Sequence, residues 1–480
     1  FLRHADQGDS PRRTYYASGR MPRRAWIFAI STSATLFAFA PAAVANGRFP
    51  ATSMLVQKPG DPSHLALRAT FGVVLSNDGG KDWDWICERA MGFGGSEDPS
   101  LLITGSGAIL VGTFAGMRRS TDGGCHFAHD ASWPANVIDL TARPAAPDRV
   151  YAVSSRFSSE TDAGNAYASQ LFVSNDAGAT WSLRSTLDPS LLIDSVEVAP
   201  SDPERVYVSA VRPEAAHVNG VLLESDDDGA HWMAHKISLE PAEQGLYVAA
   251  VDPKNASRVY LRTSGTESGR VFATDDAGKT VSVPFLQEKN ALSGFALADG
   301  GATIYAGGFG GVWSGASKDG QLTKASSTHV QCLASIGSAL WSCTPASEGY
   351  VLGTSIDHGV KFAPALTLSG MRGPLQCAPP SDMDGCAADW PALRDLVGGS
   401  KEVAAKPAPA TKRWFGCSAS PGNSGPLSPA ALTLAIGLAF FSFRRAARRV
   451  LSNVCRECVT RSIRCQRRVR HHSARSRICR

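Results

Sequence analysis

The sequence is sparing in charge and has no sustained helical period. Charged residues make up 19% of the 480 residues and hydrophobic residues 43%, a balance that excludes a wholly disordered chain. The body lacks long stretches in which apolar residues recur with the period of a helix, which argues against a helical solenoid. The Gly-x-Ser-x-Gly motif of many hydrolases is missing as well.

The formal net charge of +5 is an average over unlike segments. Residues 1–24 carry a net charge of +4 and residues 444–480 one of +12, so residues 25–443 sum to −11. An acidic body repels the phosphate backbone of nucleic acids. We therefore expect no nucleic-acid partner.

The N-terminal region has the pattern of a secretory signal peptide. Two arginines after Met21 lead into a mostly apolar run that ends at the small residues Ala43 and Ala45. This order predicts a cleaved signal peptide over 21–45 rather than a membrane anchor, because the apolar run is short. Residues 1–20 are then expected to be a non-native upstream extension.

The C-terminal region predicts a membrane anchor. Residues 401–426 form an Ala-, Pro- and Lys-containing linker that is too polar to pack. Residues 427–443 carry no charge and reach the shortest length for a transmembrane helix. Arg444 and Arg445 begin an Arg-rich tail over 444–480, which we expect to stay in the cytoplasm.

Cys417 lies just before this span, so that a Cys motif, an apolar span and an Arg cluster follow one another. The order resembles the C-terminal sorting signals of myxobacterial surface proteins. The resemblance implies that export and sorting machinery recognises the tail, with processing near Cys417, and delivers the body to the cell surface or outer envelope. Such signals end at the Arg cluster, whereas residues 450–480 continue as a true cytoplasmic tail or as readthrough.

One eight-residue pattern, Ser-x-Asp-x-Gly-x-Thr-Trp, recurs through the body and is called the octet below. Successive copies begin 44, 54, 51, 49, 43 and 38 residues apart, which is too regular for chance. The copy at 317–320 is degenerate. In the other six, the recurring residues are Ser76, Asp78, Gly80 and Trp83; Ser120, Asp122, Gly124 and Phe127; Ser174, Asp176, Gly178 and Trp181; Ser225, Asp227, Gly229 and Trp232; Thr274, Asp276 and Gly278; and Ser355, Asp357, Gly359 and Phe362.

The chemistry of the octet is conformational. The Asp carboxylate can accept backbone N–H groups of its own turn, and the Ser or Thr hydroxyl can cap neighbouring backbone groups. The Gly supplies a positive-φ position, and the closing aromatic returns to a strand and buries its ring. Each octet is therefore predicted to be a rigid hairpin tip whose residues are poor candidates for catalysis.

A turn followed by a Val-Tyr strand precedes several octets, as at Tyr151, Tyr207 and Tyr260. Each unit then contains four short strands in about 40–50 residues, the size of a propeller blade. Seven units over 46–370 predict an all-β, seven-bladed propeller that closes on itself. A Cys-containing loop and a short helix are expected over 371–400.

These octets resemble the Asp-box, or bacterial neuraminidase repeat, family of β-propellers. Sialidases, xyloglucanase-type glycosidases, sortilin-type receptors and photosystem II assembly-factor propellers share the box. The resemblance covers about two-thirds of the chain and is specific for fold. It implies little about function, because the family includes both enzymes and binders.

Six cysteines of the expected exported body are candidates for three disulfides: Cys87, Cys125, Cys332, Cys343, Cys377 and Cys386. A hairpin would bring Cys332 and Cys343 onto adjacent strands. A bridge between Cys377 and Cys386 would close a short loop and leave the first two cysteines to join the first two blades. Free buried thiols are the alternative.

The sequence predicts neither a metal site nor a cofactor. No Cys-x-x-Cys occurs in the body. The tail has one, and the full set of Cys455, Cys458, Cys465, His471, His472 and Cys479 fits no standard zinc spacing. His231 and His235 fall on a predicted strand, where four residues separate the rings by about 13 Å, too far to share a metal.

No catalytic residue can be assigned. The resemblance implies that a sialidase would carry a Phe/Tyr-Arg-Ile-Pro motif near the N-terminus. The nearest string is Gly47-Arg48-Phe49-Pro50, in which the aromatic residue follows the arginine instead of preceding it. Another glycosidase needs only two carboxylates across a cleft. Asp139, Asp194 and Glu197 fall on predicted strands, and we interpret each as a surface or turn-bonding residue.

We therefore expect a surface-anchored, non-catalytic recognition or scaffold module for an extracellular protein or polysaccharide. A glycoside hydrolase other than a standard sialidase is the alternative. Propellers bind ligands with the loops at one end of the ring. The longest such loops are predicted over 154–167 and 211–220.

Overall fold

The computed structural model describes residues 50–398, apart from 96, 131–132, 134–135, 162–163 and 215–216. The predicted signal peptide, linker, membrane span and tail, with Ala43, Ala45, Cys417, Arg444 and Arg445, lie outside these residues and remain predictions. Within the described residues, no helix has the length and apolarity needed to cross a bilayer.

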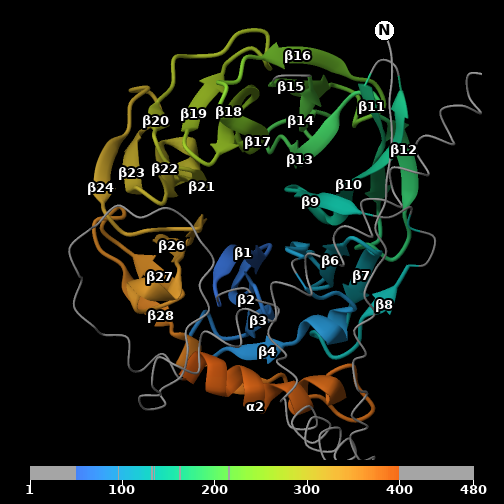
Figure 1. Ribbon diagram of the computed structural model, residues 1–480, viewed down its shortest axis with the longest axis vertical. Helices are drawn as coiled ribbons and strands as arrows, with labels where there is room; N and C mark the ends of the chain where they lie inside the picture. Colours follow the sequence, from blue (N-terminus) through green and yellow to red (C-terminus); the bar gives the residue numbers. More distant parts are fainter. Residues whose placement is uncertain are drawn as a thin grey trace, which may run out of the picture. The chain divides into compact units, whose positions relative to one another are not determined.

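Seven antiparallel sheets are arranged around a ring, which confirms the predicted all-β, seven-bladed propeller (Figure 1). Blades 1 to 4 consist of β1 (Thr52–Lys58), β2 (Asp61–Ala69), β3 (Gly72–Ser76) and β4 (Asp84–Ile86); β5 (Ser100–Ile103), β6 (Ile109–Thr113), β7 (Gly116–Ser120) and β8 (Ala128–His129); β9 (Val137–Arg143), β10 (Ala146–Thr161), β11 (Gly164–Ser174) and β12 (Ser182–Thr186); and β13 (Leu192–Val198), β14 (Val206–Pro213), β15 (Val218–Ser225) and β16 (Met233–Ile237).

Blades 5 to 7 consist of β17 (Glu243–Asp252), β18 (Asn255–Gly265), β19 (Gly269–Thr274) and β20 (Leu286–Glu288); β21 (Leu292–Ala298), β22 (Thr303–Gly308), β23 (Gly311–Ala316) and β24 (Thr323–Ser326); and β25 (Cys332–Ile336), β26 (Ala339–Cys343), β27 (Leu352–Ser355) and β28 (Ala363–Leu366). Single 3₁₀ turns lie at Glu88–Met91, Asp299–Gly301, Ala346–Glu348 and Leu368–Gly370. In each blade the strands pair in chain order, and the first strand lies nearest the ring centre (Figure 1).

The middle strands of the blades are nearly continuous apolar runs. Val150, Tyr151, Ala152 and Val153 of β10 are all fully buried. Each blade packs against a neighbour on both faces, so both sides of its central strands leave water. For this reason, apolar and polar residues alternate less strictly along these strands than in a sheet with one face in water.

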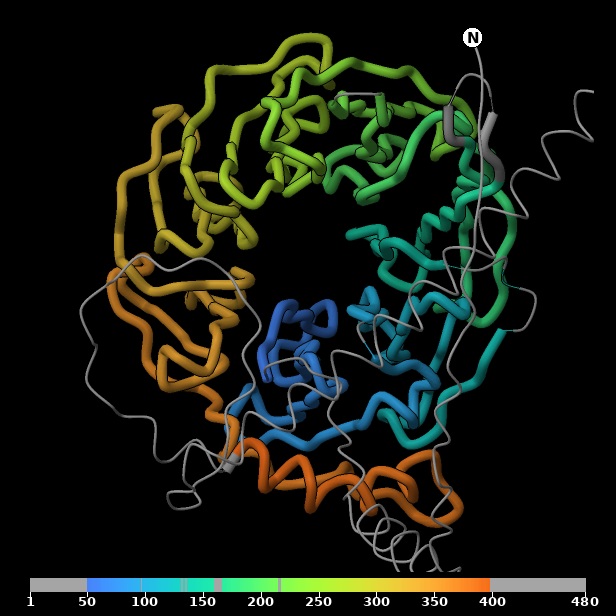
Figure 2. Tube along the Cα trace, in the orientation of Figure 1, coloured from blue at the N-terminus to red at the C-terminus, as the bar shows by residue number. Residues whose placement is uncertain are grey.

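The first and last blades close the ring. Ala51 forms a β-bridge with Pro345, and the Thr52 hydroxyl donates a 2.5 Å hydrogen bond to the carbonyl of Val351. Figure 2 shows the blue start of the described chain beside the orange blade 7. Closure of this kind covers the sheet faces that the first and last blades turn toward each other.

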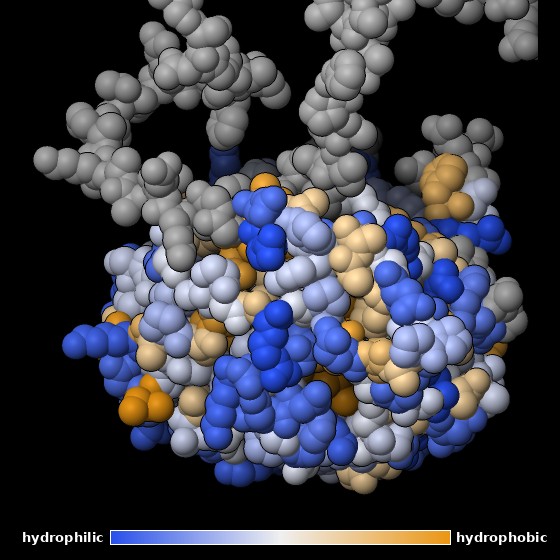
Figure 3. All heavy atoms as spheres, turned by 90° about the horizontal axis from the view of Figure 1, so that it is seen from below, coloured by the Kyte–Doolittle hydropathy of each residue, from blue (hydrophilic) through white to orange (hydrophobic). Residues whose placement is uncertain are grey.

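Residues 371–398 follow blade 7 and fold back along blades 1 and 2; we call them the clasp. Its strand β29 (Gly373–Pro374) pairs in parallel with β4, so blade 1 has a fifth strand. Helix α2 (Asp384–Gly398) lies outside β4, where Trp390 contacts Trp85 at 5.7 Å between ring centroids (Figure 1). The rim on this side is covered mostly by hydrophilic residues (Figure 3).

All six body cysteines form disulfides. The Cys332–Cys343 bridge joins β25 to β26, as predicted. The other two predicted pairings are wrong. Cys87 bonds to Cys386, and Cys125 bonds to Cys377. The reason is the return of the clasp to the first two blades, which brings together residues that are remote in sequence.

Candidate functional site

The octets form the turns between the third and fourth strands of six blades. In blade 5 the Thr274 hydroxyl donates to Asp276 Oδ1 at 2.8 Å and accepts the N–H of Gly278 at 2.7 Å. Asp276 Oδ1 also accepts the N–H of Thr280 at 2.8 Å. The octets that start at Ser76, Ser120, Ser174, Ser225 and Ser355 repeat these bonds.

These bonds occupy the octet carboxylates. The backbone N–H and hydroxyl of Thr280 and the hydroxyl of Thr274 lower the pKa of Asp276 to about 2. Four octets also place a non-glycine residue at positive φ just before the glycine: Ala177, Asp228, Ala277 and His358. The degenerate copy at Ser317 uses backbone bonds instead, with the Asp319 N–H donating to the carbonyl of Ala316.

The closing octet aromatics are buried to different extents. Trp83 is fully buried, whereas Trp181 and Trp232 are half-buried. Val281, which replaces the aromatic in blade 5, is 45% exposed. The closing position of the octet is therefore not uniformly a core position, whereas the octet hydroxyls and carboxylates are all engaged in holding turns.

Three carboxylates line the inner strands of blades 3 and 4, which corrects their interpretation as surface or turn-bonding residues. Asp139 of β9 accepts the N–H of Val196 of β13 at 3.0 Å. Asp194 of β13 likewise accepts the N–H of Leu246 of β17 at 3.0 Å. An innermost strand has a neighbour on one side only, so these two aspartates each accept an N–H group of the next blade.

Burial changes the protonation of these groups. It raises the pKa of Asp139 to about 6 and that of Asp194 to about 7. Burial and the nearby charge of Asp139 raise the pKa of Glu197 to about 8. At neutral pH Glu197 therefore holds a proton while Asp139 is largely ionised.

Asp139 and Glu197 lie close together. The Thr141 hydroxyl donates to Glu197 Oε2 at 3.0 Å. Thr141 is two residues from Asp139 on β9, a spacing of about 7 Å along a strand. The charge of Asp139 also acts on Glu197. One protonated and one ionised carboxyl that lie near each other can act as a general acid and a general base.

A cation lies on the second strand of blade 5, next to the inner strand. The Arg262 guanidinium of β18 stacks 4.5 Å from the Tyr247 ring centroid and donates to the carbonyl of Leu292 at 2.5 Å. Burial lowers the pKa of Arg262, while the charges of Tyr247 and Asp194 oppose that change. Arg262 therefore places a positive charge near the Asp194 carboxylate.

The hairpins between second and third strands lie at the other end of the ring from the octets, because the third strand of each blade connects the two. Three of these hairpins expose a phenylalanine: Phe114 is 60%, Phe157 57% and Phe309 65% exposed. The predicted loop over 154–167 is an extension of β10 and β11, in which Phe157 meets Tyr167 edge-on at 6.2 Å. The predicted loop over 211–220 is the β14–β15 hairpin.

The exposed ring of Phe309 has hydrogen-bonding groups around it. His329 lies 4.6 Å from it between ring centroids, and the His329 N–H donates to Glu348 Oε1 at 3.3 Å. A Cβ on Gly310 would lie 3.4 Å from Asn290 Nδ2 and 3.5 Å from Glu288 Oε2. An aromatic platform beside amide and carboxylate groups suits a ligand that has both apolar faces and polar substituents.

The sequence assigns no binding role to Phe309, Phe114, Arg262 or Tyr247; residues 307–311 are interpreted from it only as a glycine-rich tip between strands. A usable signal existed for Phe309, which is flanked by two glycines on each side between two strands. Such a tip cannot bury a large ring against its own backbone. For Arg262 and Tyr247 the position near Asp194 depends on ring closure, which no local pattern encodes.

The two histidines considered as metal ligands have other partners. His231 Nδ1 lies 2.6 Å from Asp227 Oδ2, and His235 Nε2 lies 2.9 Å from Glu224 Oε2. Across the described part of the chain, no group of three or more His, Cys, Asp or Glu side chains could hold a metal ion.

No family model and no curated protein sequence matches the chain. Among solved structures, an ancestral GH74 enzyme shares 16% identity at a TM-score of 0.46, over 62% of this chain and 44% of that one. The Niastella koreensis GH74 enzyme shares 14% identity at a TM-score of 0.28, over 66% of this chain and 72% of that one. Kuenenia stuttgartiensis hydrazine synthase shares 12% identity at a TM-score of 0.48, over 66% of this chain and 98% of that one.

The chain spans less than half of the ancestral GH74 enzyme. At these identities and scores the likeness carries no argument about activity. The class defined by the strand topology itself is a seven-bladed β-propeller.

Proposed function

We propose that this chain is an exported, surface-anchored propeller of the Asp-box type that recognises an extracellular polysaccharide or protein with the hairpin end of its ring. The observation that carries the proposal is the placement of Phe114, Phe157 and Phe309, three exposed rings on hairpins of that end. Exposed aromatic side chains on loops of a rigid scaffold are typical of binding surfaces.

The contrast between the two ends supports this assignment. Octet carboxylates such as Asp276 are bonded within their own turns. The hairpin end instead offers aromatic rings together with Glu288, Asn290 and His329, none of which has its polar groups consumed by a repeated turn. The support for anchoring is the sequence pattern of the predicted span and Cys417.

The test is a pair of substitutions. Phe309→Ala is expected to weaken ligand binding by about tenfold or more, because a central aromatic anchor contributes on the order of 2 kcal/mol to an interface. Val283→Ala is the matched control, since Val283 is 79% exposed but follows an octet. Dissociation constants are measured by calorimetry against ligands found on polysaccharide and protein arrays. Equal affinities of the two variants would contradict the assignment.

A glycoside hydrolase is the second candidate, and the observation that favours it is the Asp139–Glu197 pair. In that mechanism Glu197 would donate the proton to the leaving group, and Asp139 would act as base or nucleophile. Hydrolysis would then fall by at least about 100-fold in Glu197→Gln. If no glycan is cleaved by the unmodified protein, the pair serves only to join blades 3 and 4.

A further inference from the structure

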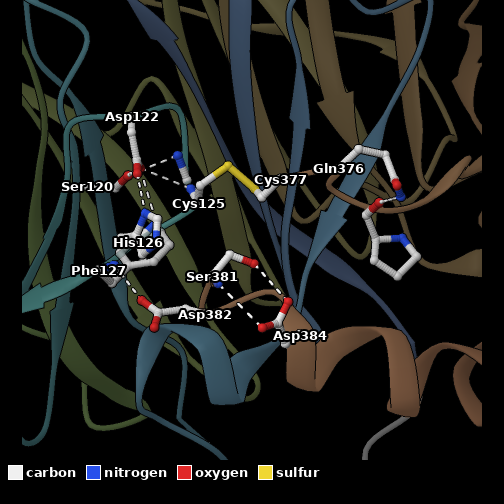
Figure 4. Close-up of a disulfide and its surroundings, with 12 residues drawn as sticks. Ser120, Asp122, Cys125, His126, Phe127, Gln376, Cys377, Ser381, Asp382 and Asp384 are labelled. Atoms are coloured by element: carbon white, nitrogen blue, oxygen red, sulfur yellow. Dashed lines mark hydrogen bonds and ion pairs between the residues drawn. A yellow bond between two sulfur atoms is a disulfide. The ribbon is translucent and has the colours of Figure 1, made fainter. Parts of the chain in front are cut away.

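One of the two clasp disulfides is more accessible to water than the other clasp disulfide and the disulfide of blade 7. Cys125 belongs to the octet of blade 2, and Cys377 lies in an irregular segment between β29 and α2 (Figure 4). Both residues are partly exposed. By contrast, Cys87 and Cys386 are 3% and 0% exposed. Cys332 and Cys343 are buried as well.

The segment that carries Cys377 is a strap, residues 375–382, whose side chains are mostly exposed. Beyond the disulfide, three hydrogen bonds hold it to blade 2. Asp382 Oδ2 accepts the N–H of Phe127 at 2.7 Å, and the Asp382 N–H donates to the carbonyl of Cys125 at 3.0 Å. His126 Nε2 lies 2.8 Å from the carbonyl of Pro380. Figure 4 shows His126, Phe127 and Asp382 grouped below the disulfide.

Helix α2 is attached separately. The buried Cys87–Cys386 bridge joins its first turn to blade 1. Trp390 packs on Trp85, and Arg89 pairs with Asp389 at 2.8 Å. The strap can therefore leave blade 2 while α2 keeps its own covalent and packing contacts.

We propose that Cys125–Cys377 is a thiol-exchange site, at which a dithiol reductant releases the strap from blade 2 and leaves α2 in place. One thiolate of the dithiol attacks Cys377 Sγ, the Cys125–Cys377 bond breaks, and Cys125 takes up a proton. The second thiol of the dithiol then attacks the mixed disulfide and frees Cys377. Two electrons and two protons pass to the protein, and the dithiol becomes a cyclic disulfide. Exposed disulfides are the ones that exchange, because the attacking thiolate must reach the sulfur.

The charged groups that face the site are Asp122, His126, Asp382 and Asp384. The Asp122 carboxylate and the Pro380 carbonyl raise the pKa of His126. Release of the strap removes the Pro380 partner. The pKa of His126 is therefore expected to fall when the bridge opens, and an NMR titration of the imidazole reports strap release directly.

The first experiment is a graded reduction of the intact, oxidised chain by dithiothreitol without denaturant, followed by alkylation and peptide mass spectrometry. Cys125 and Cys377 are expected to be alkylated about tenfold faster than Cys87 and Cys386. The Cys332–Cys343 bridge is the internal control and is expected to stay oxidised. Loss of either buried bridge first, or loss of all three at one rate, would overturn the proposal.

The second experiment uses a variant whose folding does not depend on reductant. In Cys125→Ser/Cys377→Ser, limited proteolysis is expected to cut within 375–382 about tenfold faster, while hydrogen exchange of α2 is unchanged. Cys332→Ser/Cys343→Ser is the matched control and should leave the strap as resistant as in the unmodified protein. A strap that stays resistant without its disulfide, or an α2 that loses protection together with it, would refute the independent release.

Discussion

Loss of the Cys87–Cys386 bridge is expected to lower the free energy of unfolding by about 4 kcal/mol. The two cysteines are 299 residues apart, but Cys125–Cys377 still closes the chain when the first bridge is removed. The Cys87→Ser/Cys386→Ser variant therefore loses only the constraint of a loop of some tens of residues. Chemical denaturation followed by circular dichroism measures the change.

Removal of the second clasp bridge should cost more than removal of the first. Once both are absent, no covalent bond ties the clasp to blades 1 and 2, and the denatured chain regains the freedom of a loop of hundreds of residues, about 5 kcal/mol. Cys332–Cys343 closes only 11 residues and serves as the control, with a loss of about 3 kcal/mol. A loss for the double clasp variant that is no larger than that for one bridge would contradict the claim that the two bridges together tie the clasp to blades 1 and 2.

Stability is expected to fall as the pH rises from about 5 to about 8. The folded protein holds protons on Asp139, Asp194 and Glu197 at pH values where the unfolded chain has released them, because burial raises the pKa of these groups to about 6, 7 and 8. Their contribution is therefore fully present below about pH 4 and is lost as the pH rises through the folded values. Arg68, Arg262 and Tyr247 are the charged or titratable groups that face them.

The lowered pKa of the octet aspartates has the opposite sign. Asp276, with a pKa of about 2, contributes stability that is present above about pH 4 and is lost in stronger acid. The two effects together predict a maximum of stability near pH 5. Urea unfolding at pH 3, 5 and 8 locates this maximum.

Glu197→Gln isolates the inner-wall contribution. The neutral amide keeps the size of the side chain but cannot ionise, so the variant is expected to gain on the order of 2–3 kcal/mol over the unmodified protein at pH 8 and little at pH 5. Glu267→Gln, on the exposed β18–β19 hairpin, is the control and should change neither value. An unmodified protein that gains stability between pH 5 and 8 would contradict burial of the three carboxyl groups.

The blade count could be predicted from the sequence because it is encoded locally. Each octet specifies its own turn through a hydroxyl, a carboxylate and a positive-φ glycine within eight residues. Even the degenerate copy at Ser317 falls where a turn is needed between β23 and β24. Regular spacing of such turns leaves room for four strands per unit, and seven units suffice to close a ring.

The inner-wall carboxylates could not be recognised in the same way. Asp139 of β9 and Glu197 of β13 are 58 residues apart in the sequence, and they meet only when blades 3 and 4 pack. The sequence of a single strand predicts that each of these charged residues faces solvent. Their raised pKa values are a property of the closed ring.

The cysteine pairing failed for a related reason. Cys377 and Cys386 are near in sequence, so a short loop is the simplest hypothesis. The clasp is extended by the β29–β4 pairing, which directs its two cysteines to different blades. Arg372, which contacts Asp82 and Asp84 on blade 1, contributes to that direction.

Recognition without cleavage is the central claim, and product analysis on a glycan and protein array tests it most directly. The residues expected to be exported, 46–400, are incubated with the array, and both retained protein and released fragments are measured. The account predicts saturable binding that requires Phe309 and no new reducing ends. Release of fragments from any glycan, abolished by Glu197→Gln, would contradict it and assign the inner-wall pair to catalysis.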